Sequence, residues 1–84
     1  MSTLNWVPAF NVEHDALIAC VNRADLGAGN VLHSIRVGRK TNDGSKPSQF
    51  LRTDDMSSMA QLAIKVSARI LEDINDVRRN STRA

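Results

Sequence analysis

The chain has few residues that could staple it or bind a metal: it contains one cysteine, Cys20, and two histidines. A single cysteine cannot form an intramolecular disulfide, which excludes a disulfide-stapled fold and fits a reducing compartment. Zinc sites draw on cysteine and histidine pairs at short spacing, and His14, His33 and Cys20 form no such pair. We interpret His14 as solvated and His33 as packed on an inward strand face, and we expect no metal and no cofactor.

Long hydrophobic runs are also missing. The longest one, residues 16–21, is far shorter than the roughly 20 apolar residues that span a bilayer. Residues 1–12 have neither the basic stretch nor the apolar stretch of a secretory signal. With 42% hydrophobic and 24% charged residues, the composition is that of a globular chain rather than a disordered one. We therefore expect a cytoplasmic protein with no membrane partner.

Motifs for catalysis or nucleotide binding are absent as well. The glycines of residues 27–29 are followed by no Lys-Ser/Thr pair, and no Gly-x-Ser-x-Gly occurs. The paired acids at 54–55 lie at a helix start, where the helix dipole favours them. Those at 72–73 fall on a polar helix face, with Asp73 one turn after Arg69. We expect a protein that is not an enzyme.

The strongest pattern that is present predicts a helix over residues 55–80. At 100° per residue its apolar positions fall in one narrow stripe, consisting of Met56, Met59, Ala63, Val66, Ile70, Ile74 and Val77. Such a helix is about 39 Å long, whereas a compact domain of this size is roughly 30 Å across. Because the stripe exceeds what one small domain covers, it predicts a homo-oligomer, a dimer or higher.

A second helix is predicted over residues 12–26. Asn11 is a good N-cap, and Glu13 and Asp15 place acids in the first turn, where the helix dipole favours them. Gly27 supplies the left-handed residue that commonly ends a helix. The sequence therefore predicts an amphipathic N-terminal helix.

The two ends of the chain are expected to be extended. Residues 1–11 form an arm, because Pro8 disfavours helix in the residue before it. Trp6 and Phe10 are the natural anchors of this arm on a partner. Residues 81–84 are expected to be a short tail.

Residues 31–53 are predicted to form a β-hairpin. Apolar and polar residues alternate over 31–38, the sequence at 42–44 is typical of a turn, and a return strand would follow at 48–52. The apolar residues also fit a short helix over 30–37, so both alternatives stay open, with the alternation favouring the strand.

Positive charge is concentrated in this middle segment, although the formal net charge of the chain is only +2. Against one acid, Asp43, residues 28–53 carry five cations: Arg36, Arg39, Lys40, Lys46 and Arg52. Lysine and arginine on a protruding hairpin can neutralise phosphates and release counterions, which predicts nucleic-acid or anion binding. Phe50 is the one aromatic residue of this segment that could stack on a base.

Together these patterns predict a single α+β domain spanning 1–84, in the order α-β-β-α. The N-terminal helix and the basic hairpin would pack on a long C-terminal helix that also oligomerises. The expected function is that of a small noncatalytic binding protein that presents the hairpin to a polyanion, nucleic acid first. One alternative is a protein-protein interaction module, an adaptor or an inhibitor that occludes a partner's site. Another is sequestration of a small phosphorylated ligand between subunits. The basic patch would equally suit an acidic protein surface.

Overall fold

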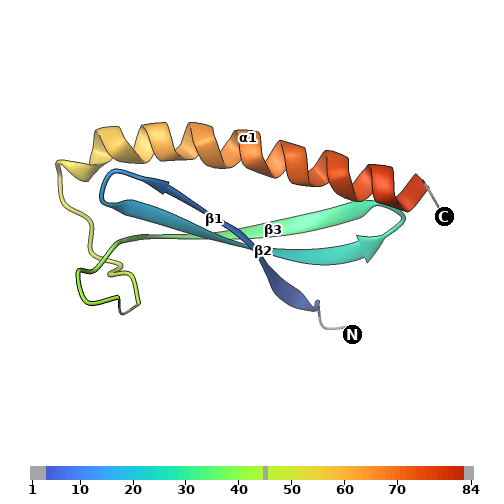
Figure 1. Ribbon diagram of the computed structural model, residues 1–84, viewed down its shortest axis with the longest axis horizontal. Helices are drawn as coiled ribbons and strands as arrows, with labels where there is room; N and C mark the ends of the chain where they lie inside the picture. The colour runs from blue at the N-terminus through green and yellow to red at the C-terminus, as the bar shows by residue number, and fades with distance from the viewer. Residues whose placement is uncertain (1–3, 45, 83–84) are drawn as a thin grey trace.

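The protein is built from an antiparallel three-stranded sheet and one long helix that lies along one face of it (Figure 1). The structure is a computed structural model that describes residues 4–44 and 46–82. In chain order the elements are β1 (Trp6–His14), β2 (Leu17–Gly27), β3 (Asn30–Arg39) and α1 (Asp55–Thr82). The strand order is β1-β2-β3, so β2 is central. The expected α+β class is confirmed, whereas the order α-β-β-α is wrong.

The predicted N-terminal helix over 12–26 is not present, since these residues form the end of β1 and most of β2. The chain reverses at Asp15, which adopts a left-handed φ of 53° that aspartate tolerates better than most residues. His14 then pairs with Leu17 across a two-residue turn. Of the two acids expected in a first helical turn, Glu13 therefore lies in β1 and Asp15 in the hairpin turn. From Trp6 onward the predicted extended arm is part of β1 and pairs with β2, and its residues 1–3 lie outside the described part of the chain.

Gly27 and Gly29 lie at the turn between β2 and β3, and not at the end of a helix. Ala28 and Gly29 have φ values of 55° and 80°, the left-handed pair required by the type I′ turn of a two-residue hairpin. Gly27, at φ 87°, lies at a register shift between β2 and β3. It is thus part of a strand reversal and not a helix cap.

The predicted hairpin over 31–53 is half right. Its first half is a strand, β3, which resolves the strand-or-helix alternative for 30–37. The partner of β3 is β2, however, and not residues 48–52. Within the described part of the segment that follows β3, a single bridge pairs Ser48 with Arg39, by backbone N···O distances of 2.7 and 2.8 Å. The return strand is therefore replaced by a loop held at one point.

Gly38 is what allows this loop to approach the strand. A Cβ atom at this position would lie 2.8 Å from the Ser48 carbonyl oxygen and 2.9 Å from the Pro47 Cβ. We expect Gly38→Ala to keep the sheet but detach the loop, because the added methyl group would overlap the Ser48 backbone and force it away from β3. Amide hydrogen exchange measures this: Ser48 should lose protection, while Lys40, whose N–H bonds the Ala16 carbonyl, should keep it. Unchanged Ser48 protection would contradict the expectation.

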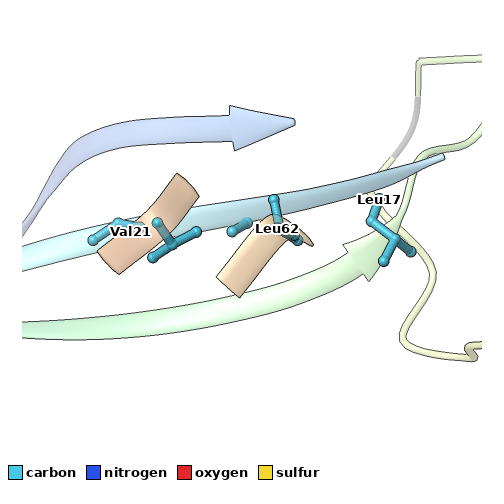
Figure 2. Close-up of a cluster of buried hydrophobic side chains, with 5 residues drawn as sticks. Leu17, Val21 and Leu62 are labelled. Carbon is cyan, nitrogen blue, oxygen red and sulfur yellow. The ribbon is translucent and has the colours of Figure 1, made fainter. Parts of the chain in front are cut away.

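The predicted C-terminal helix is confirmed as α1, which extends from Asp55 to Thr82. Its sequence contains neither glycine nor proline, so nothing interrupts the backbone hydrogen bonds. Leu62 and Val66 of α1 pack on alternate residues of the central strand (Figure 2). The fully formed core is this small cluster of Leu17, Ala19, Val21, Leu62 and Val66. Helix α1 thereby covers one face of the sheet, and no helix of the described residues lies over the opposite face (Figure 1).

The helix stripe predicted for oligomerisation is therefore used partly within the chain. Val66 is buried, and Met59 and Ile70 pack against the core. Met56 and Ala63 are exposed, and Ile74 and Val77 are half-buried. Self-association through the remainder of the stripe stays a prediction.

Candidate functional site

The uncovered face of the sheet, the face opposite α1, carries the side chains that could meet a partner. Residues paired across neighbouring strands share a face, so the register defines its rows. One row is Pro8, Asn22 and Ser34, the next is Asn11, Cys20 and Arg36. The centre of this face is therefore polar, with one cation, Arg36.

A second cation reaches the same face from the loop after β3. Lys46, Pro47 and Gln49 join Arg36 and Cys20 around an open recess of about 330 Å³. Arg36 and Lys46 are both exposed, and neither forms an ion pair with any described residue. The loop thus brings two unneutralised cations together on the uncovered face.

The other three predicted cations lie elsewhere. Arg39, Lys40 and Arg52 line a separate open recess of about 630 Å³. Lys40 Nζ lies 2.9 Å from the Glu13 carboxylate, and Arg39 Nη1 lies 2.6 Å from Asp55 Oδ1. Two of these three cations are therefore already paired with acids, and the structure does not gather all five on one hairpin.

Asp55 fastens the start of α1 to this recess. Its carboxylate accepts a hydrogen bond from the Arg52 backbone N–H at 2.8 Å as well as from the Arg39 guanidinium. The Arg52 N–H has the largest effect, and together with Arg39 it outweighs burial, so the pKa of Asp55 lies below its ordinary value. The side chain of the first residue of α1 thus holds the backbone that leads into the helix. Arg39 therefore has a structural role here.

The two predicted aromatic anchors are on opposite faces. Trp6 pairs with Ala24 on the uncovered face and is 41% exposed. Phe10 lies on the helix side, where the Arg69 guanidinium sits 4.6 Å from its ring centroid. Since Phe10 packs against the core, Trp6 alone of the two is placed to meet a partner on the uncovered face. Phe50, in the loop, is 87% exposed, more than any other large apolar residue that the structure describes.

A buried polar cluster joins α1 to the sheet and was missed by the sequence patterns. Asp73 accepts hydrogen bonds from Arg23 Nη1 and His33 Nε2, both at 2.7 Å, in place of the expected contact with Arg69. Burial by itself raises the pKa of Asp73, but the bonds from His33 and Arg23 outweigh it and leave the pKa below its ordinary value. The His33 side chain is 6% exposed, so this ring is packed inward, as expected, and closed to a substrate.

No group of three or more histidine, cysteine, aspartate or glutamate side chains is arranged to hold a metal ion among residues 4–44 and 46–82. None of the helical sequence in that part of the chain is long and apolar enough to cross a membrane.

Comparison of the chain with protein-family models, with curated proteins and with solved structures finds no match in any of the three.

Proposed function

We propose that this is a noncatalytic binding protein that holds nucleic acid on the uncovered face of its sheet and on the adjoining loop. The observation that carries the proposal is the convergence of Arg36 and Lys46 on this face, with no described acid paired to either. A phosphate backbone is the partner that such cations suit best, since each phosphate contacted releases condensed counterions.

The surroundings of the two cations suit a nucleic acid more than a simple anion. Asn11, Asn22 and Ser34 offer hydrogen-bond donors and acceptors along the face. Phe50 lies in sequence between Gln49, which lines the recess on the uncovered face, and Arg52, which lines the other. An aromatic side chain this exposed can stack on a base, which is worth roughly 1–3 kcal/mol per base.

A protein-interaction module is the second candidate, favoured by a different observation. At one end of the uncovered face, Trp6 and Leu32 flank Ala24 in one row and are 41% and 43% exposed. Apolar residues grouped in this way suit a protein partner. The third hypothesis, a small phosphorylated ligand, receives less support, because Arg39 and Lys40 in the larger recess are already paired with acids.

The salt dependence of binding tests the proposal. For each phosphate contact, the slope of log K against log salt should steepen by about 0.9 on duplex and about 0.7 on single strands. We expect Arg36→Gln to reduce the slope by that amount for each copy of the chain that binds. Fluorescence anisotropy of labelled oligonucleotides measures K, and the single tryptophan, Trp6, reports contact with this face independently.

Lys65→Gln is the matched control, since Lys65 is an exposed cation on α1, on the other side of the molecule from the uncovered face. It should leave the slope unchanged. The proposal fails if the two variants lower the slope equally, or if no oligonucleotide binds at about 50 mM salt. Binding of a protein partner that is lost on changing Leu32 but not Arg36 would favour the second candidate.

A further inference from the structure

The outer edge of β3 is left open. Arg39 exchanges backbone hydrogen bonds with Ser48, away from β2, so the backbone groups of residues 31, 33, 35 and 37 also point outward, because strand groups alternate. No described strand pairs with them. Unpaired strand edges of this kind bind other strands unless they are blocked.

The two edges of the sheet differ in this respect. β1, on the far side, contains Pro8 and a register shift between Pro8 and Phe10, and both features discourage pairing with another strand. β3 contains no proline, and its register with β2 is regular from Val31 to Arg39. Only the β3 edge is therefore built to accept a further strand.

An apolar groove runs beside this open edge, between β3 and α1. Its walls enclose about 190 Å³ and are lined by Ile35 and Val37 from the strand and by Met59, Ala63, Ser67 and Ile70 from the helix. Ile35 is 50% exposed, unusual for an isoleucine on the side of a sheet that a helix covers. The groove-lining positions of α1 run from Met59 to Ile70, about 17 Å, and carry no charged residue. Asp73, just beyond them, is held by Arg23 and His33.

The protein also exposes more surface than its size requires. Its accessible area is 6260 Å², compared with roughly 4,900 Å² for a compact chain of 9.2 kDa. Its radius of gyration is 14.8 Å, compared with about 12 Å. The surplus of roughly 1,300 Å² exceeds the ~800 Å² that each partner buries in a standard interface.

We infer that a second copy of this chain docks on the β3 edge and its groove, around a two-fold axis near Ser34 and Ile35. The outward groups of residues 31–37 then pair with their own counterparts, and two sheets join into one of six strands. In a two-fold dimer the same surface patch of each copy faces itself. A charged patch would repel its counterpart, whereas the uncharged groove and the unpaired strand edge would not. A strongly charged partner would find nothing complementary in this groove.

This arrangement does not depend on the proposed function, but it extends it. Side chains of even-numbered residues of β3 lie on the uncovered face, so Arg36 and its counterpart in the second copy would lie on one continuous surface. Because the two binding faces of a dimer are joined, the dimer binds one nucleic-acid strand more tightly than a single copy does, without any new contact.

Light scattering on size-exclusion fractions over a range of concentrations tests the inference. We expect wild type to be a dimer and Ile35→Glu to weaken it roughly a hundredfold or more, since two unpaired carboxylates would be buried close together. Ile64→Glu is the control: Ile64 is also exposed, at 65%, but lies outside the groove and should leave the dimer intact. Circular dichroism checks that both variants fold.

Cross-linking separates a second copy on this edge from other assemblies. In a Cys20→Ser background, Ile35→Cys should form an intermolecular disulfide on mild oxidation, and Ile64→Cys should not. A monomer at all concentrations overturns the inference, and so does a dimer that survives Ile35→Glu and gives no cross-link through position 35. The Arg36→Gln variant tests nucleic-acid binding separately. A protein that dimerises through β3 but binds no nucleic acid would refute the proposed function and leave this inference standing.

Discussion

Leu62→Ala should destabilise the protein by about 3–4 kcal/mol, measured by urea denaturation at a fixed protein concentration. Leu62 is 1% exposed and meets Leu17 and Val21 of the central strand (Figure 2). Truncation removes the apolar contacts and leaves a cavity, which costs about 2–5 kcal/mol for a buried leucine. A chain of this size has only about 4–12 kcal/mol of stability in total, so this one change should bring it close to unfolding.

Ile64→Ala provides the comparison for this change. Ile64 lies two residues further along α1, is 65% exposed, and loses little by truncation because its side chain is mostly in water. Alanine is also the better helix former, so this variant should be within about 0.5 kcal/mol of wild type. Equal losses at the two positions would show that α1 does not pack on β2 through Leu62.

Asp73→Asn is the second change expected to have a large effect, a loss of about 2–3 kcal/mol. The amide keeps the shape of the carboxylate but leaves the Arg23 guanidinium, 29% exposed, without its counter-charge. Fully buried pairs lose about 3–5 kcal/mol when one partner is removed, and the partial exposure of Arg23 lowers that figure. Asp76→Asn is the matched control, since Asp76 pairs with Arg79 on the exposed face and should change stability by no more than about 0.5 kcal/mol.

The acid limb of the stability curve gives an independent readout of the same carboxylate. Because its pKa is lowered by folding, the stability that Asp73 contributes is complete above the ordinary pKa of 3.8 and is lost as the pH falls through the lower folded value. Wild type should therefore lose stability more steeply than Asp73→Asn below about pH 4. Parallel curves for the two proteins would contradict the assignment of Asp73 as an ionised partner of Arg23 and His33.

Residues 12–26 show how a local pattern can satisfy two structures. Leu17, Cys20, Val21 and Ala24 are spaced for one helix face, while Leu17, Ala19 and Val21 are spaced for one strand face. The strand prevails because β2 has partners on both sides and its inner residues meet α1. The clue in the sequence is the two-residue connection Ala28-Gly29, which joins two strands of matching length.

The sequence shows which cations lie in the middle segment but not how they are arranged in space. The five cations of 28–53 were identified from charge alone, and Arg36 and Lys46 do share one surface. Two of the other cations are paired with acids from distant parts of the chain, Arg39 with Asp55 and Lys40 with Glu13. The number of charges in a segment does not reveal such contacts. Phe10 was expected to be an anchor for a partner because nothing in the sequence places it under Arg69.

The sequence by itself determined α1, because the interactions that make a helix join residues three and four apart and are visible in a short window. For residues 31–38 the alternation of apolar residues favoured a strand but left a short helix over 30–37 open, and the structure decided for the strand. Only the tertiary structure decided which strand β3 pairs with, which cations remain without acids, and that Asp73 meets Arg23 and His33, 50 and 40 residues away. Strand pairing and ion pairing depend on residues distant along the chain, and those are brought together only when the sheet and the helix pack.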